Sequence, residues 1–195
     1  MILIGEIRDA ETMESAITFA ETGHLCLSTL HANNANQAIE RILNFFPPER
    51  AHEIRLQLSL NLRGIISQRL LPTLTGGRAA ALEIMLDTPR IRDLIKRGEI
   101  EALKDAMDQG AGEGCKTFDS ALYDLVTANK ISDAEALRAA DSPNNLRIRI
   151  DRFRNLGDSP DAPVLRLATP PKPKAPAPAA APVAPRPPGA SPIRN

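Results

Sequence analysis

The chain has 195 residues, with 24 Lys and Arg against 24 Asp and Glu, so its formal net charge at pH 7 is zero. This balance offers no global electrostatic reason to bind nucleic acid or an anionic membrane. A chain of this length could hold one domain or slightly more. Hydrophobic residues make up 43% of the chain, which suits a globular core, but no apolar run approaches the roughly 20 residues of a membrane-spanning helix. The first residues also lack the basic region and cleavage site of a signal peptide.

The cysteines and histidines favour a reducing compartment and predict no metal site. Cys26 and Cys115 lie far apart and outside any Cys-x-x-Cys pair. Cys26 falls in an apolar run, so we expect it to be a reduced core residue, which indicates the cytoplasm. The three histidines have no supporting cysteines and make no convincing zinc site. We expect His52 to be solvated on a helix.

The first 31 residues predict a strand, a helix and a second strand. Residues 1–4 and 25–30 are apolar runs, and the intervening stretch has an N-cap candidate, Asp9, and helical spacing of its apolar residues. Buried parallel strands are typically continuous apolar runs that a helical crossover connects. Because ligands lie outside the carboxyl ends of such strands, Glu6 and His31 are expected to share one ligand-binding edge.

The middle of the chain predicts two helices and a hairpin. Apolar spacing favours helices over 36–46 and 49–61. The pattern then becomes strand-like over 63–72, and a Thr-Gly-Gly turn at 75–77 leads to a partner strand over 78–86.

The remainder predicts short helices and then a tail. Residues 110–114 contain three glycines and are expected to be a flexible break. From residue 157 the chain is rich in Pro and Ala, which favours disorder with polyproline character. An inert tail and a docking segment both fit this composition. The predicted helices cover 89–97, 100–107, 117–128, 134–140 and 145–153.

Two segments of the first 33 residues carry a family resemblance. Residues 2–12, Ile-Leu-Ile-Gly-Glu-Ile-Arg-Asp-Ala-Glu-Thr, resemble the Walker B segment of the type II/type IV secretion ATPase superfamily. Residues 23–33, which run from Gly-His through Ser-Thr-Leu-His-Ala-Asn, resemble the His box of that superfamily. The two motifs at this separation are far more specific than either alone. The resemblance is strongest to the pilus-retraction branch, the PilT/PilU twitching-motility ATPases, and extends to about residue 150.

The resemblance implies roles for five residues in these motifs. Glu6 would polarise the water that attacks the γ-phosphate; the alternative is a carboxylate that caps the loop. His31 would sense the γ-phosphate or couple it to a neighbouring subunit, whereas His24, at the other end of the strand, is expected to be structural. Ordinary strand-flanking histidines are the alternative for both. Arg8 and Asp9 could support the site or reach a subunit boundary, and a surface ion pair fits equally well.

Residues 90–97 resemble the retraction branch's Ala-Ile-Arg-Asn-Leu-Ile-Arg-Glu motif. Ile91, Arg92, Leu94 and Ile95 match, and the other four positions depart from it in a direction that favours PilU over PilT. A plain amphipathic helix is the alternative. Secretion-type and assembly-type relatives carry a four-cysteine zinc module after the core, and residues 69–83 contain no cysteine, which also favours the retraction branch.

The fold class implied is α/β: the carboxyl-terminal part of a RecA-like P-loop ATPase core over 1–86, a helical subdomain over 87–156, and a disordered tail over 157–195. No Gly-x-x-x-x-Gly-Lys-Ser/Thr loop, which would cradle ATP phosphates, occurs in the sequence. We therefore expect a fragment of a longer ATPase; a natural short protein is the alternative.

The resemblance implies a motor subunit for type IV pilus retraction that hydrolyses ATP with Mg²⁺. It also implies a homo-hexamer, or a mixed hexamer with a related pilus ATPase. This hexamer would be cytoplasmic and would contact the inner-membrane pilus platform protein. The isolated chain is expected to be inactive. Alternatively, the chain is a non-catalytic interaction module that joins and modulates a hexamer of a complete pilus ATPase. A mixed α/β domain of unrelated function is the third alternative. No nucleic-acid partner is expected.

Overall fold

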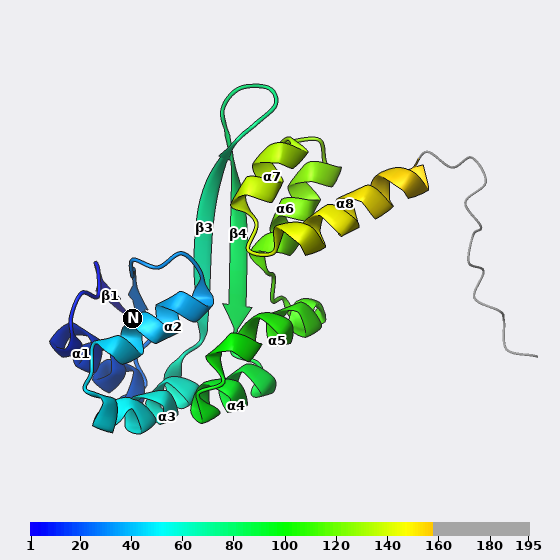
Figure 1. Cartoon of the computed structure of the whole chain (residues 1–195). Helices are drawn as coiled ribbons and strands as arrows, with labels where there is room; N and C mark the ends of the chain where they lie inside the picture. Colours follow the sequence, from blue (N-terminus) through cyan, green and yellow to red (C-terminus); the bar gives the residue numbers. More distant parts are fainter. Residues whose placement is uncertain (158–195) are drawn as a thin grey trace, which may run out of the picture. The chain divides into compact units, whose positions relative to one another are not determined.

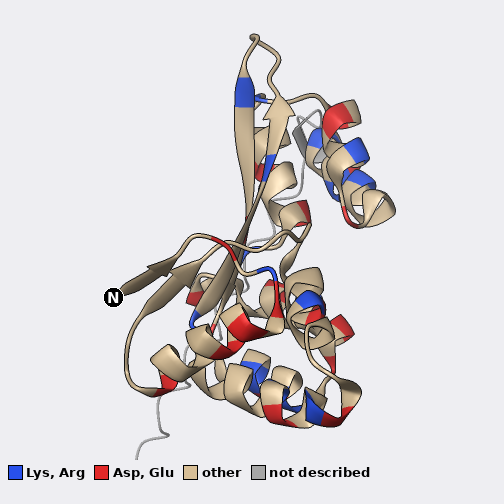
Figure 2. Cartoon of the chain, turned by 90° about the vertical axis from the view of Figure 1, so that its left-hand side faces the viewer, with Lys and Arg blue, Asp and Glu red and all other residues tan. Residues whose placement is uncertain are grey.

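A computed structural model describes residues 1–157 of the chain (Figure 1). The predicted disordered tail lies outside these residues from position 158 onward. The first half contains both strands and helices, and the second half consists of helices (Figure 1). Basic and acidic side chains are interspersed along the helices (Figure 2).

The predicted strand–helix–strand unit is confirmed. Strands β1 (Ile2–Ile4) and β2 (Cys26–Ser28) pair in parallel, and helix α1 (Ala10–Glu21) connects them. The helix begins where Asp9 Oδ1 accepts a hydrogen bond from the Thr12 amide at 2.8 Å. It ends before Gly23, whose φ of 87° is a conformation that glycine adopts readily.

One face of the β1–β2 pair is partly buried and the other is exposed. Ile2 and Ile4 are partly buried on the side of α1, but Leu3 on the opposite face is 77% exposed, and Leu25 and Leu27 beside it are also exposed. Cys26 is only half-buried, so the prediction that it is a core residue is wrong. An apolar run indicates a strand, but each face of a sheet is buried only where another layer packs on it. Residues 1–157 supply such a layer for one face of this sheet.

The next segment consists of helix α2 (Ala35–Asn44), a short 3-10 helix η1 (Pro48–Arg50) and helix α3 (Ala51–Asn61). Asn34 caps α2 by accepting from the Gln37 amide at 2.9 Å. His52 on α3 is exposed, as predicted.

The predicted antiparallel hairpin is confirmed as strands β3 (Gly64–Pro72) and β4 (Arg78–Leu86). The turn uses Gly76 and Gly77, with φ of 82° and 114°, in the left-handed region where side chains are strained. Alternate positions of each strand face inward, and one of these positions holds the buried Glu83.

The second half begins with α4 (Pro89–Arg97), η2 (Ile100–Ala102) and α5 (Leu103–Gln109). The predicted break at 110–114 does separate two helices, but it is not irregular: it forms the 3-10 helix η3 (Gly110–Glu113), in which the Gly114 and Cys115 amides donate to the Ala111 and Gly110 carbonyls. Three helices follow: α6 (Phe118–Thr127), α7 (Asp133–Ala139) and α8 (Pro143–Gly157).

The buried side chains form two hydrophobic clusters that share the hairpin. The first joins α1–α5 to the base of the hairpin through Ile65 and Met85. The second joins α6–α8 to the turn-proximal half through Leu71 and Ala81. Helices α4 and α5 belong to the first cluster, whereas the predicted division at residue 86 groups them with the later helices; that division stays a prediction. No helix within residues 1–157 is both long and apolar enough to cross a membrane.

Candidate functional site

The parallel pairing of β1 and β2 brings the residues that follow each strand to the same edge. There, the Ile7 amide donates to the Thr29 carbonyl at 3.0 Å, and Thr29 Oγ1 donates to the Gly5 carbonyl at 2.6 Å. These bonds extend the register past the strand ends and place Glu6 beside His31.

Glu6 is held by two basic side chains, His31 and Arg8. Its Oε1 lies 2.8 Å from His31 Nε2, and its Oε2 accepts from Arg8 Nε at 2.6 Å. The Glu6 side chain is 19% exposed, whereas those of His31 and Arg8 are 80% and 76% exposed. The carboxylate is thus fixed, and its two partners reach it from the solvent side.

The pKa of Glu6 lies below its ordinary value of 4.5. The hydrogen bond from Arg8 is the main cause, and the charges of Arg8, His31 and Arg41 act in the same direction against partial desolvation. Glu6 is therefore an ionised acceptor at neutral pH, suited to orienting a water molecule or a cation.

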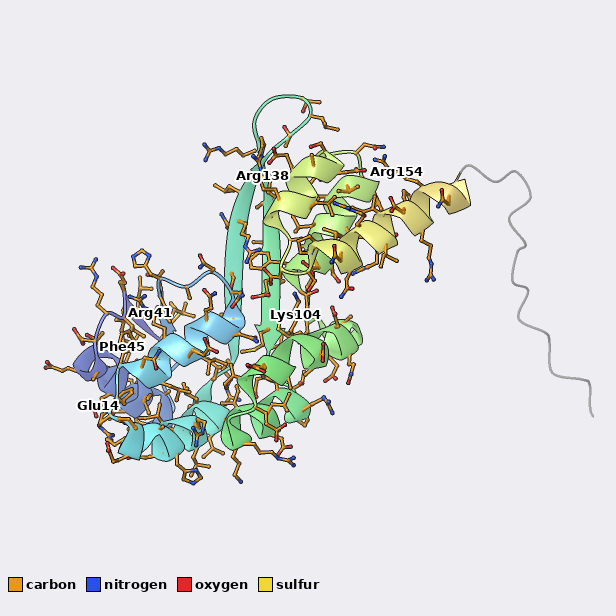
Figure 3. The ribbon with its side chains drawn as sticks, viewed as in Figure 1. Glu14, Arg41, Phe45, Lys104, Arg138 and Arg154 are labelled. Carbon is orange, nitrogen blue, oxygen red and sulfur yellow. The ribbon has the colours of Figure 1, made fainter. Side chains whose placement is uncertain are left out.

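An open cavity of about 540 Å³ adjoins His31. The loop after β2 forms one side and helix α2 the other, from which Arg41 extends (Figure 3). The cavity lining is mainly polar and consists of Leu30, His31, Ala32, Asn33, Gln37, Glu40, Arg41 and Asn44. An anionic group could enter this space beside His31 and meet the positive charge of Arg41.

Two of the predicted site residues lie apart from Glu6 and have local roles. Asp9 caps α1, and the hydrogen bond from the Thr12 amide lowers its pKa. His24 precedes β2 at the opposite end from His31; its Nδ1 lies 3.1 Å from Thr22 Oγ1, and its ring meets that of Phe19 edge-on.

The retraction-like motif lies on α4 and makes contacts within the chain. Ile91, Leu94 and Ile95 are buried in the first cluster. Arg92 binds Asp87 with two hydrogen bonds of 2.5 and 2.8 Å, and Arg63 adds a third of 3.1 Å. The apolar positions therefore anchor the helix, and the arginine ties it to the end of the hairpin.

Sequence reasoning missed Glu83 and Arg69. Glu83 is 3% exposed, and its Oε1 accepts from the Ala35 amide, the first of α2, at 2.7 Å. Burial raises the pKa of Glu83. The only signal in the sequence was an acidic residue at an inward-facing position of a predicted strand.

Mg²⁺ and ATP are the groups that the motifs imply, and the residues present fit a part of such a site. Glu6 supplies an ionised oxygen acceptor, and His31 and Arg8 supply donors toward an anionic group. Within residues 1–157 there is no cluster of three or more His, Cys, Asp or Glu side chains that could hold a metal ion.

Comparison with known proteins places this geometry in a family. Residues 1–96 match the family described as Type II/IV secretion system protein. The chain is 52% identical over 163 residues to the type IV pilus ATPase PilU of Pseudomonas aeruginosa, covering 83% of this chain and 42% of PilU. It is 42% identical over 145 residues to the retraction ATPase PilT of the same organism, covering 74% of this chain and 42% of PilT.

A solved structure agrees. The crystal structure of the pilus retraction motor PilT with bound ADP matches with a TM-score of 0.68 and 38% identity, over 75% of this chain and 41% of PilT. This chain thus spans less than half the length of these relatives. The predicted α/β fold of part of a RecA-like ATPase is confirmed. The chain belongs to the PilT/PilU family of the type II/IV secretion ATPases.

Proposed function

We propose that this chain forms part of an ATP-hydrolysing motor for type IV pilus retraction, with Glu6 and His31 at the terminal phosphate. The contact of 2.8 Å between Glu6 and His31 at the strand edge carries the proposal. The identity is higher to PilU than to PilT, which favours a PilU-like role. The proposal includes assembly into a homo-hexamer or a mixed hexamer. It also includes contact with the inner-membrane platform protein and a peripheral cytoplasmic location.

In this proposal Glu6 orients the attacking water. The carboxylate is ionised and can accept a hydrogen bond from water, while Arg8 holds its second oxygen in place. Positioning of this kind is the main protein contribution to phosphoryl transfer. ATP with Mg²⁺ supplies the phosphoryl group and neutralises its charge.

His31 is suited to report on the phosphate because it is highly exposed. Its Nε2 is bonded to Glu6 in this structure, and 80% of the side chain is accessible, so a small rotation can redirect the imidazole to an anionic oxygen in the adjoining cavity. The His31–Glu6 contact then breaks when a phosphate is present and re-forms when it leaves.

The decisive experiment is a chimera in which this chain replaces the aligned segment of P. aeruginosa PilU. We expect ATP hydrolysis that falls at least about 100-fold in the Glu6→Gln variant, since an amide cannot serve as an anionic acceptor. Glu21→Gln, at the exposed far end of α1, is the matched control and should leave the rate unchanged. An active chimera that tolerates Glu6→Gln would refute the role of Glu6.

The exposed leucines of the β1–β2 sheet favour a second candidate, an interaction module that joins a complete pilus ATPase. Leu3, Leu25 and Leu27 share one exposed apolar face, a surface of the kind that packs against another protein segment. Co-purification with a complete PilU at fixed stoichiometry, abolished by Leu27→Asp but not by Leu60→Asp on the exposed side of α3, would support it. Failure to associate in any nucleotide state would exclude it.

A further inference from the structure

The loop that carries His31 is held from behind by two side chains of the hairpin. Glu83 Oε1 accepts from the Ala35 amide at 2.7 Å, and Arg69 Nη2 donates to the Asn33 carbonyl at 3.2 Å. Arg69 pairs with Ala81 across the hairpin, so strand alternation puts Arg69 and Glu83 on the same face as diagonal neighbours. Both contacts fall within four residues of His31.

The same guanidinium also reaches the connection between α7 and α8. Arg69 Nη1 donates to the Ala139 carbonyl at 2.6 Å, and Nη2 lies 2.8 Å from Asp141 Oδ1. The guanidinium carbon stands 3.9 Å from the centre of the Phe118 ring, at the start of α6. The planar guanidinium thus contacts three acceptors and one aromatic ring at the same time. A lysine ammonium group cannot make this set of contacts.

This connection is itself cross-linked. Asp119 on α6 accepts from the backbone amides of Asp141 and Ser142 at 2.8 and 3.1 Å. Lys104 on α5 (Figure 3) lies 3.2 Å from Asp119 and 3.6 Å from Asp141. A shift of the α7–α8 connection therefore pulls on Asp141 and through it on Arg69.

We propose that Arg69 and Glu83 are positioning residues that fix the backbone of residues 33–35, and hence the direction of His31, and that Arg69 couples this loop to the helices α6–α8. The link to catalysis rests on the proposed contact of His31 with the phosphate, but the coupling itself does not. A change of nucleotide state that turns His31 is transmitted to α6–α8, and displacement of these helices changes the site.

The test uses the full 195-residue chain and two readouts. Amide hydrogen exchange measures residues 33–37 and 139–142, and the imidazole ¹⁵N resonances report whether His31 is bonded to Glu6. In Arg69→Met we expect exchange at both segments to rise about tenfold, as loss of charge-assisted hydrogen bonds predicts. The His31 resonances should move toward their values in Glu6→Gln.

Further variants separate positioning from general destabilisation. Arg69→Lys keeps the charge and should still lose the Asn33 contact and move the His31 resonances. Asp141→Asn leaves both contacts to the loop in place and should shift the same resonances less. Arg138→Met, on an exposed side chain of neighbouring α7 that pairs with Glu135, should change neither readout.

The inference is overturned if the folded Arg69 variants leave the 33–37 amides and the His31 resonances unchanged, or if only residues 139–142 respond. These readouts are independent of ATP hydrolysis. If the PilU chimera is inactive but the Arg69 variants loosen residues 33–37, the proposed function is refuted and the coupling stands. If the chimera is active but the Arg69 variants leave residues 33–37 unchanged, the coupling is refuted and the proposed function stands.

Discussion

At the scale of single residues, Glu6 and Glu83 are two carboxylates with opposite environments. Glu6 is paired with Arg8 and His31, which lowers its pKa. Glu83 is buried against a backbone amide, and desolvation outweighs that hydrogen bond and the nearby cations, so its pKa is raised. The surroundings of Glu6 therefore stabilise its anionic form, whereas burial disfavours the anionic form of Glu83.

Arg8→Gln should raise the pKa of Glu6 toward 4.5, since it removes the main cause of the depression. A carboxyl whose pKa is lowered in the folded state stabilises the fold at pH values above its ordinary pKa, and this stability is lost as the pH falls through the lowered pKa. The variant should lack this contribution. A ¹³C NMR titration of the Glu6 carboxyl carbon measures the shift, with Arg147→Gln on α8 as control. An unchanged titration would show that Arg8 does not hold the carboxylate in solution.

Glu83→Gln should gain stability relative to the wild type as pH rises above 4.5. A raised folded-state pKa means that the native chain holds its proton longer than the unfolded chain, so wild-type stability falls as pH rises from 4.5 through the raised pKa. Gln retains an oxygen that can accept from the Ala35 amide. Thermal unfolding across this pH range tests the prediction, with the exposed Glu101→Gln as control. A difference between Glu83→Gln and wild type that is the same at every pH would contradict it.

At the scale of elements, helix α4 shows how one motif serves packing and placement. Thr88 Oγ1 caps the helix by accepting from the Ile91 amide at 3.3 Å, and Gly98 ends it with a φ of 82°. Between these ends three apolar side chains pack into the first cluster, chiefly against α3. Three of the four residues that match the retraction motif are therefore buried core residues, and they hold α4 against the end of the hairpin.

Ile95→Ala should destabilise the chain by about 3 kcal/mol, because it leaves a cavity at a side chain that is 1% exposed. Ile148→Ala on α8 is the control; that side chain is 63% exposed, and its loss should cost no more than about 0.5 kcal/mol. Urea unfolding measures both. Equal costs would mean that α4 does not pack in solution as it does here.

At the scale of the whole molecule, the hairpin is the shared element. Its base enters the first hydrophobic cluster and its turn-proximal half enters the second, while Arg69 links the His31 loop to the α7–α8 connection. The described residues therefore have a physical route from the strand edge to the last three helices.

The purified 195-residue chain should show no ATP turnover above background. It has Glu6 and His31, but its sequence contains no Gly-x-x-x-x-Gly-Lys-Ser/Thr loop to bind the phosphates. Phosphate release under saturating Mg-ATP measures this, with Glu6→Gln measured in parallel. Turnover that disappears in Glu6→Gln would show that these residues suffice for catalysis.

The local features could be predicted from the sequence because each depends on neighbours along the chain. The strand–helix–strand unit follows from apolar runs and a capping residue, and the hairpin follows from its two turn glycines. The proximity of Glu6 and His31 follows from the parallel pairing of two apolar runs, since Glu6 lies two residues after β1 and His31 three residues after β2. The cap at Thr117 and the start of α7 at Ser132 were predictable for the same reason.

Other features were decided only by the tertiary structure. A strand pattern marks Leu3 as apolar but cannot say whether a layer covers it, and alternation marks Glu83 as inward-facing but does not identify the amide that it accepts from. The three acceptors of Arg69 come from segments 36 to 72 positions away. The sequence by itself determined the elements and the family motifs, because these depend on residues close together along the chain. It also determined the edge that bears the site, because two apolar runs joined by a helix pair in parallel. The support behind that edge depends on contacts between distant segments, which exist only once the chain has folded.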